Sequence, residues 1–141
     1  MEKPKLVLDT NVVLSATLKP DGLQRLILQL ALSPFCELFI SAPILEEYEE
    51  VLRRKRFKLP SDEVDKLIDL IKNSAVMVTP TKVITASRDA DDNKFLECAE
   101  EANADYIVTG NKKHFPAKWK KTKVVNGREM MDLMLRGLLE L

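Results

Sequence analysis

Three acidic side chains occur where the neighbouring residues are apolar. Asp9 directly follows a strand-like run at residues 6–8. Glu47 borders the apolar stripe of one amphipathic segment, and Asp92 falls on the apolar face of another. An ionised carboxylate that faces a protein interior must be paired, hydrogen-bonded or bound to a metal ion. These three residues are therefore the first candidates for chemistry.

Each candidate also has an ordinary structural interpretation. Asp9 could form a turn or a helix cap, because aspartate is common in both. Asp92 would lie in the first turn of a helix, where free N–H groups favour anions, and Asp89 with Asp92 has the spacing of a capping box. The glutamates around Glu47 point away from its apolar stripe, and Lys94 falls on the face of its helix opposite Asp92, as is typical of solvated residues.

If the three carboxylates meet, their negative charges raise one another's pKa values. A divalent cation removes that conflict, and carboxylate oxygens select Mg²⁺ or Mn²⁺. A water molecule activated by such an ion can attack a phosphodiester without a nucleophile from the protein. This agrees with the sequence, in which His114 is the single histidine and no Ser-His-Asp or Cys-His arrangement is evident.

Short apolar strands alternate along the chain with amphipathic helices. Strands are expected at residues 6–8, 38–40, 76–78, 106–108 and 124–125. Helices are expected in five places. The first follows Asp21, which has capping-box spacing with Gln24, and the last follows Asn126, which has the same spacing with Glu129. The other three run from Ser41 to about Arg54, from a cap at Ser61, and from Asp89 to about Ala102. The alternation predicts one α/β domain over residues 1–141, a three-layer α/β/α sandwich around a mainly parallel sheet. Ligands of such sheets bind beyond the carboxyl ends of the strands, which is where Asp9 falls.

The composition is that of a globular protein. The chain has 141 residues, of which 45% are hydrophobic and 31% charged, and its net charge is zero. A zero total does not indicate a nucleic-acid binder, but it says nothing about how charge is distributed. Cys36 and Cys98 lie in apolar surroundings without zinc-like spacing, which predicts buried thiols in a reducing compartment. No signal peptide or membrane-spanning run is evident, so we expect a cytoplasmic protein.

Two basic stretches, residues 53–58 and residues 112–123, are candidate contacts for a nucleic acid. The stretch from residue 112 to residue 123 contains no acidic residue, a local asymmetry in a neutral chain. Basic side chains would bind phosphates, and Phe115 or Trp119 could stack on an unpaired base. The alternative is a solvated loop with a partly buried tryptophan. The candidates are Arg53, Arg54, Lys112, Lys113, His114 and Trp119.

Four segments together resemble the motifs of PIN-domain nucleases, and the likeness covers nearly the whole chain. They are residues 8–13, 41–52, 88–96 and 105–111. The resemblance implies Mg²⁺ or Mn²⁺ held by Asp9, Glu47 and Asp92, and endonucleolytic cleavage of RNA. It also implies the toxin of a toxin–antitoxin pair, blocked by a small antitoxin protein and often a homodimer.

One position departs from the family pattern. Many PIN domains carry an acidic residue where this chain has Asn111, which can bind a metal ion through its carbonyl oxygen but brings no charge. Asp89 or Asp91 could compensate as a further metal ligand, or Asp89 could simply cap a helix. The alternative function is therefore a catalytically weak or inactive RNA- or antitoxin-binding protein. The side chains that could orient metal-bound water or phosphate are those of Thr10, Asn11 and Thr109.

Two other families that use an aspartate after the first strand fit less well. Phosphatases of the haloacid-dehalogenase type need a second acid two residues later, where this chain has Asn11. A phospho-acceptor signalling domain needs an acidic pair after the first strand, and this chain has its pair at Asp91 and Asp92.

Overall fold

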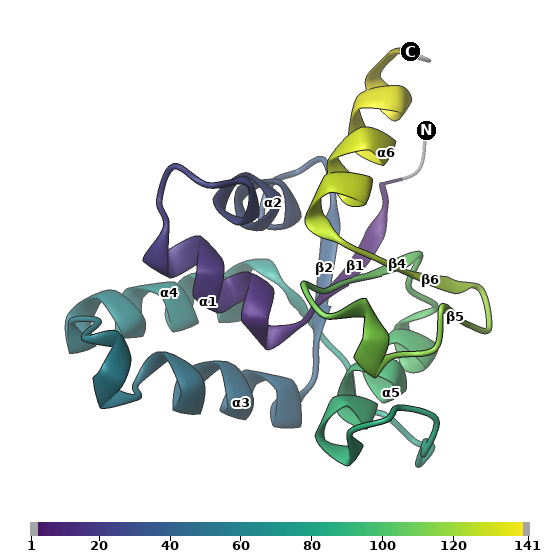
Figure 1. Ribbon diagram of the computed structural model, residues 1–141, viewed down its shortest axis with the longest axis horizontal. Coiled ribbons are helices and arrows are strands. Elements are labelled where there is room, and N and C mark those ends of the chain that lie inside the picture. Colours follow the sequence, from purple (N-terminus) through teal and green to yellow (C-terminus); the bar gives the residue numbers. More distant parts are fainter. Residues whose placement is uncertain (1–2, 140–141) are drawn as a thin grey trace.

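The computed structural model describes residues 3–139, and its central feature is a six-stranded sheet (Figure 1). The strands are β1 (Lys5–Leu8), β2 (Glu37–Ile40), β3 (Val76–Met77), β4 (Tyr106–Val108), β5 (Lys118–Trp119) and β6 (Thr122–Val125). Their order is β3-β2-β1-β4-β6-β5, and every neighbouring pair is parallel except β5 with β6. The predicted, mainly parallel sheet is confirmed.

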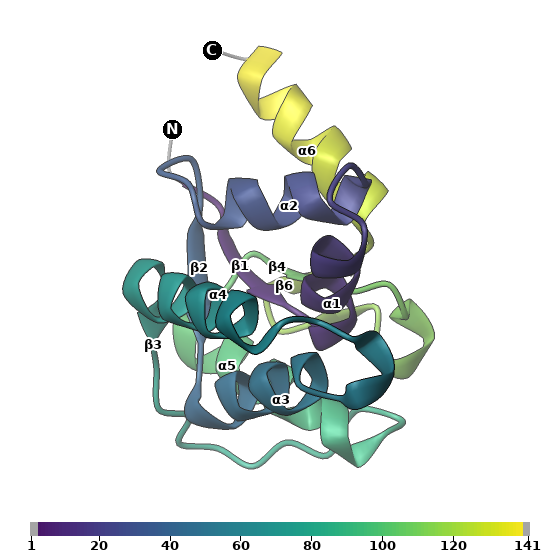
Figure 2. The same cartoon turned by 90° about the vertical axis from the view of Figure 1, so that its left-hand side faces the viewer.

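Helices cover both faces of the sheet. They are α1 (Thr10–Leu18), α2 (Leu23–Ala31), α3 (Ala42–Leu52), α4 (Ser61–Ser74), α5 (Asn93–Ala102) and α6 (Gly127–Leu139), with 3₁₀ turns η1 (Lys55–Phe57), η2 (Ala90–Asp92) and η3 (Lys112–His114). Helices α1 to α4 gather on one side, and α5 packs on β1, β2 and β4 from the other (Figures 1 and 2). Helix α6 contacts α2 and projects beyond the rest of the fold. The predicted three-layer sandwich is confirmed. No helix within residues 3–139 combines the length and the apolar character that crossing a bilayer requires.

The interior is apolar and centred on β1. Val7, Leu8 and Ile107 are completely buried, as expected for strands of a parallel sheet covered on both faces. Cys36 and Cys98 are buried free thiols, as predicted. Burial raises the pKa of Cys36 to about 11 and that of Cys98 to about 12, so neither is a reactive thiolate near neutral pH.

Capping side chains explain where several helical segments begin. Helix α3 follows Ser41 and has a proline in its first turn, as predicted, but the Ser41 side chain forms no cap hydrogen bond. At α6 the predicted capping box is confirmed, because the Glu129 N–H donates to Asn126 Oδ1 (2.8 Å) and the Asn126 N–H donates to Glu129 Oε1 (3.0 Å). The side chain of Asp89 accepts from the N–H of Asp91 and caps η2.

Two predicted caps are wrong. Helix α2 begins after Gly22, which forms no side-chain cap hydrogen bond, so Asp21 and Gln24 form no capping box. Helix α4 already includes Ser61, and Pro60 takes the cap position. Proline suits the start of a helix because its fixed φ fits and the N–H it lacks would have no partner there.

Helix α1 was not predicted from the sequence. It begins directly after Asp9 and buries Val12, Val13 and Ala16. β-Branched residues have low helix propensity, so the local signal is weak. Packing against α2 and α3 stabilises the helix instead.

Candidate functional site

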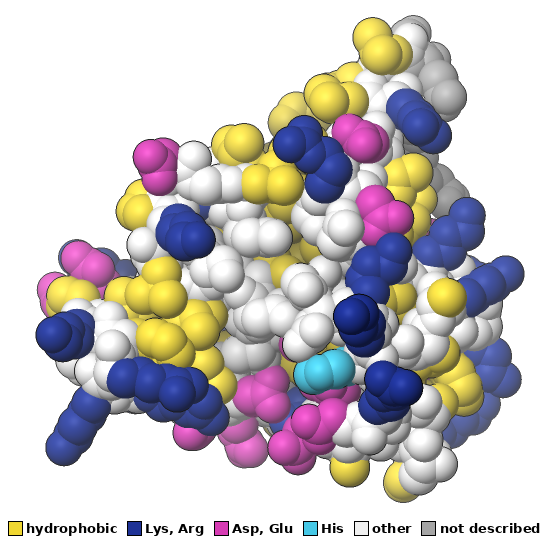
Figure 3. All heavy atoms as spheres, in the orientation of Figure 1, with side chains coloured by type: hydrophobic (Ala, Val, Ile, Leu, Met, Phe, Trp, Pro, Cys, Tyr) yellow, Lys and Arg dark blue, Asp and Glu magenta, His cyan; other side chains and the backbone are white. Residues whose placement is uncertain are grey.

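The candidate site lies beyond the carboxyl ends of β1 and β4, two central and neighbouring strands. Leu8 pairs with Val108 at the end of this ladder, so Asp9 and Thr109 emerge side by side. Helix α3 supplies Glu47 to this edge, and η2 supplies the fourth residue, Asp92. Figure 3 shows acidic side chains gathered over the lower part of this face, with basic side chains on both sides.

Asp9 is the most buried of the three acids. It is only 6% exposed, its Oδ1 accepts from the Thr10 N–H (2.7 Å), and its Oδ2 accepts from the Thr109 hydroxyl (2.7 Å). Burial raises the pKa of Asp9 to about 6, the charges of Asp92 and Glu47 add to the rise, and the two hydrogen bonds oppose it. Among the ion pairs formed within residues 3–139, none involves Asp9. When ionised, this buried carboxylate therefore has no cationic partner.

Asp9 is thus a helix cap and remains a candidate site residue. It occupies the N-cap position of α1, which is the ordinary interpretation of an aspartate at this place in the sequence. Its burial beside two further acids is what makes it a candidate for chemistry as well.

Glu47 connects three helices. The hydroxyl of Thr10, at the start of α1, donates to Glu47 Oε2. The ammonium of Lys94, in α5, donates to Glu47 Oε1 at 2.6 Å, and the side chains of this ion pair are both 22% exposed. Glu47 itself belongs to α3. Both of its carboxylate oxygens are therefore engaged by the chain.

Asp92 lies in η2, immediately before α5. The prediction that it sits on the apolar stripe of a helix from Asp89 is wrong, because a 3₁₀ turn precedes α5 and changes the angular spacing. Asp92 is half-buried, and its Oδ2 lies 3.2 Å from Nδ1 of His114. Burial is the largest cause that raises the pKa of Asp92, followed by the charge of Asp89, while His114 lowers it.

The loop after β4 is fixed by side chains that the sequence analysis named. The Asn111 N–H donates to the Thr109 hydroxyl oxygen (2.9 Å), and the Gly110 N–H donates to Asn11 Oδ1 (3.1 Å). The Asn111 side-chain nitrogen lies 3.3 Å from Nε2 of His114. Thr109 and Asn11 thus position the loop against the start of α1.

Two residues without a predicted role lie at the site, Lys94 and Tyr48. Lys94 was expected on a solvated face, but it is half-buried against Glu47. Tyr48 is completely buried, and its hydroxyl donates to the carbonyl of Leu8, the residue before Asp9. Burial raises the pKa of Tyr48 well above its usual value. A tyrosine in an apolar stripe indicates a buried hydrogen bond, so this contact could have been anticipated.

The negative charges of Asp92 and Glu47 raise the pKa of Asp9, but the three carboxylates are not arranged around one position that a metal ion could occupy. In the part of the chain that the structure describes, no three Asp, Glu, His or Cys side chains are arranged to hold a metal ion. Glu47 and Asp92 are instead paired with Lys94 and His114. The donor set nevertheless fits a hard divalent cation in its chemistry, because the three acids offer only oxygen and the charge on Asp9 lacks a cationic partner.

The basic candidates are divided between the site and other places. Lys113 and His114 lie in η3, just after Asn111. Arg54 lines a hollow of about 440 Å³ together with Glu47, Lys94 and other residues. His114 contacts Asp92 and Arg54 shares the hollow with Glu47, so both of these side chains lie near the acids.

Of the three other candidates, Lys112 and Arg53 are paired with acidic side chains, and Trp119 lies far from the site. Lys112 binds Glu129 at the start of α6 (2.8 Å), and the Arg53 guanidinium pairs with acidic side chains of α3 and α4. Trp119 pairs with Thr122 at the beginning of β6. Because β6 runs parallel to β4, its beginning lies at the opposite edge of the sheet from the site. Trp119 is therefore not brought to the acids. The prediction that Phe115 could stack on a base is wrong, because its ring is buried against that of Phe95.

Comparisons with known proteins agree with this architecture. The family model of the PIN domain matches residues 5–113, a range that includes Asp9, Glu47 and Asp92. The uncharacterized protein MJ1680 of Methanocaldococcus jannaschii is 34% identical over 113 residues, which is 78% of this chain and 72% of that protein. A chain from the crystal structure of VapBC2 from Rickettsia felis, bound to a DNA fragment from their promoter, has the same fold. That chain gives a TM-score of 0.56 at 16% identity, over 86% of this chain and 98% of the other. The chain therefore belongs to the PIN-domain family, whose members are generally nucleases that need divalent metal ions.

Proposed function

We propose that this chain is a metal-dependent endoribonuclease in which Asp9, Glu47 and Asp92 hold Mg²⁺ or Mn²⁺. The observation that supports this most is the buried carboxylate of Asp9, which lies beside two further acids and has no ion-pair partner within residues 3–139. A bound divalent ion would supply an activated water molecule and offset charge on the phosphate. Asn111 and Asp89 are the candidates for a further ligand.

The chain's own residues prepare Asp9 for this role. Thr10 and Thr109 each donate one hydrogen bond to a different oxygen of its carboxylate, so the side chain is held in one rotamer. Each oxygen keeps a further lone pair for another partner. Tyr48 anchors the carbonyl of Leu8 and thereby fixes the backbone from which Asp9 emerges. Such pre-organisation lowers the cost of binding.

An acidic site needs neighbouring positive charge to bind a polyanion such as RNA. Lys113 and His114 are placed to contact phosphates on one side, and Arg54 lines the hollow on the other side but already pairs with Glu50 (2.9 Å). We expect a smaller contribution from Lys112 and Arg53, whose charges are already paired. The cytoplasm, where the two free cysteines stay reduced, is the proposed location.

The test is cleavage of a labelled single-stranded RNA by protein freed of metal with a chelator. We expect no cleavage until Mg²⁺ or Mn²⁺ is restored. Glu47→Gln and Asp92→Asn should each lower the rate at least about tenfold, because each removes one carboxylate charge from the proposed ligand set. Glu49→Gln is the matched control on the same helix, since Glu49 only pairs with Arg53. Cleavage in the chelator, or equal rates for the variants at positions 47 and 49, would contradict the proposal.

Asn111 favours one alternative, a PIN-fold protein that binds RNA or an antitoxin with little or no cleavage. Its side chain contacts His114 and brings no charge to the site. The same assay separates the two functions. A binding protein would retain RNA at every Mg²⁺ or Mn²⁺ concentration and release no product, and Asp9→Asn would leave its RNA affinity unchanged.

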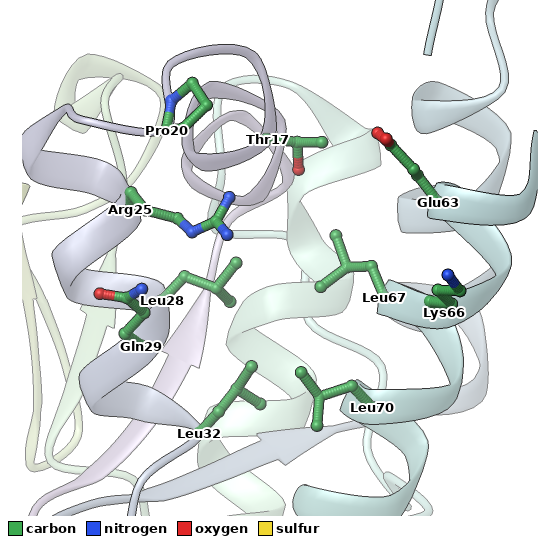
Figure 4. Close-up of a pocket in the computed structure, with 10 residues that line it drawn as sticks. All are labelled: Thr17, Pro20, Arg25, Leu28, Gln29, Leu32, Glu63, Lys66, Leu67 and Leu70. Carbon is green, nitrogen blue, oxygen red and sulfur yellow. The ribbon is translucent and has the colours of Figure 1, made fainter. Parts of the chain in front are cut away.

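We also propose that the chain is a toxin whose partner is a small antitoxin protein. A groove of about 530 Å³ separates α2 from α4, away from the acids (Figure 4). An apolar floor with a polar rim suits one amphipathic segment of a partner. The floor contains Leu28, Leu32, Leu67 and Leu70, and the rim contains Arg25, Gln29, Glu63 and Lys66. Homodimer formation stays a prediction.

Leu70→Lys should weaken antitoxin binding at least about tenfold, because a charge would enter the apolar floor. Leu26→Lys is the matched control, since Leu26 is 51% exposed and Leu70 is 50% exposed, but Leu26 does not line the groove. The measurement is titration of each variant with a small candidate antitoxin protein that the wild-type chain binds. Equal binding by both variants would show that the partner occupies another surface.

A further inference from the structure

The ion pair between Lys94 and Glu47 differs from the other ion pairs of residues 3–139. It is the only one in which both side chains are less than a third exposed. Its ammonium lies 2.6 Å from Oε1 of Glu47, whose other oxygen accepts from the hydroxyl of Thr10. Partly buried charges are screened by salt less than exposed ones. This contact therefore dominates the surroundings of Glu47 in the metal-free protein.

We propose that Lys94 is a positioning residue that neutralises Glu47 in the metal-free site and leaves it when a divalent ion binds. This inference rests on the proposed function, because it requires that Glu47 bind the ion. A dication on the same carboxylate would lie close to the ammonium, and the two positive charges would repel each other. Each cation would therefore lower the affinity of Glu47 for the other.

The arrangement of the acids fits such an exchange. With Glu47 held by Lys94, no three acidic, histidine or cysteine side chains of residues 3–139 are placed around a common point. Thr10 keeps the other oxygen of Glu47 next to Asp9, since Thr10 is the residue that follows Asp9. Release of Lys94 would leave Glu47 free to turn toward Asp9 without leaving the site.

The structure also offers a place to which the displaced ammonium can move. Lys94 lines the hollow of about 440 Å³ together with the acids Glu46, Glu50 and Asp91. Lysine has a flexible four-carbon chain and a compact charge, so it can exchange partners at little cost. Lys94 would therefore stay near carboxylates after it leaves Glu47.

The first test uses the unchanged protein and the reactivity of its lysines toward trace acetic anhydride, read by mass spectrometry. Saturating Mn²⁺ should raise the labelling rate of Lys94 at least about threefold, because its amine becomes more exposed. Lys121 is the internal control, since it pairs with Asp105 at the opposite edge of the sheet (3.5 Å). Unchanged or slower labelling of Lys94, at a Mn²⁺ level shown to bind, would overturn the inference.

The second test measures Mn²⁺ affinity by electron paramagnetic resonance. Lys94→Met should bind Mn²⁺ about three- to tenfold more tightly, because the competing charge is gone. Arg54→Met is the matched control: Arg54 lines the same hollow but pairs with Glu50, and its loss should change the affinity less than about twofold. Equal tightening in both variants would show only a general effect of charge and would overturn the inference.

The outcomes separate this inference from the proposed function. If the wild-type chain binds Mn²⁺ and Lys94→Met binds it equally or more weakly, Lys94 does not compete and only the inference fails. If neither protein binds Mn²⁺ at millimolar concentration, the metal site itself is absent and both proposals fail. Circular dichroism of Lys94→Met establishes that the variant is folded before its affinity is compared.

Discussion

Replacement of Asp9 with asparagine should abolish metal-dependent cleavage and, at the same time, stabilise the metal-free protein at pH 7. Burial raises the pKa of Asp9 from its usual 3.8 to about 6. Each pKa unit corresponds to about 1.4 kcal/mol, so the ionised side chain costs the folded state about 3 kcal/mol at neutral pH. Asparagine removes that cost, but its amide cannot accept from both Thr10 and Thr109 as the carboxylate does. We therefore expect a net gain of about 1–2 kcal/mol.

The dependence of stability on pH tests independently whether the ionised Asp9 side chain destabilises the folded protein. A carboxyl group whose pKa is raised on folding binds its proton more tightly in the folded state. Its cost to stability is absent below pH 4, appears as the pH rises, and is complete somewhat above pH 6. The difference in unfolding free energy between Asp9→Asn and the wild-type protein should therefore grow between pH 4 and pH 7. Urea denaturation at several pH values, with a chelator present, measures it.

The activity loss at position 9 should be at least about 100-fold, larger than at the two other acids, because Asp9 is the buried member of the set. Asp69→Asn is the matched control, since Asp69 is exposed on α4. It should change neither cleavage nor the dependence of stability on pH. An Asp9→Asn protein that cuts RNA normally, or that is less stable than the wild type at pH 7, would remove the basis of the proposed site.

Phe95→Ala should cost about 3–4 kcal/mol of stability, the largest effect we expect from a single substitution. Phe95 is completely buried in the first turn of α5. Its ring meets that of Phe115 edge to face, with centroids 6.3 Å apart and an interplanar angle of 71°. Phe115 follows His114, and Phe95 follows Asp92 by three residues, so the two rings hold together the segments that carry this acid and this histidine.

Chemical denaturation of Phe95→Ala measures the loss, and Phe35→Ala is the matched control. Phe35 is 63% exposed, so its truncation should cost less than about 0.5 kcal/mol. Phe95→Leu keeps most of the buried volume and should cost about 1–1.5 kcal/mol, which keeps the comparison measurable if the alanine variant does not fold. Similar losses at positions 35 and 95 would contradict the assignment of Phe95 to the core of the site.

The sequence predicts the layers of this fold because buried parallel strands leave a strong local signal. β1, β2 and β4 are short apolar runs with no solvent-facing alternation, and α4 and α5 bury one face each. Helix α1 leaves no such signal. Its segment contains apolar and small residues on several sides, and contacts with α2 and α3 decide its conformation.

Asp9 and Glu47 could be named from the sequence because a carboxylate next to apolar residues is unusual, whereas Lys94, the ion-pair partner of Glu47, could not be named as one. Lys94 reaches Glu47 across 47 residues of chain, and no local pattern records such a contact. For Trp119, closeness in sequence suggested a closeness in space that the fold does not have. It follows the basic residues of η3 closely in sequence, but the hairpin of β5 and β6 places it at the far edge of the sheet.

The hydrogen bond between Asp9 and Thr109 spans 100 residues of sequence, and the N–H of Thr109 in turn donates to the carbonyl of Val125 (2.9 Å). A chain still emerging from the ribosome presents Asp9 early, but β4 and β6 cannot yet join β1, because non-local strand pairing must wait for the later residues. The proposed ribonuclease is thus incomplete until most of its 141 residues have been made. The proposed cleavage of RNA would therefore begin only after β4 and β6 have joined β1, so a partly synthesised chain would not cut the messenger or the ribosome that produces it.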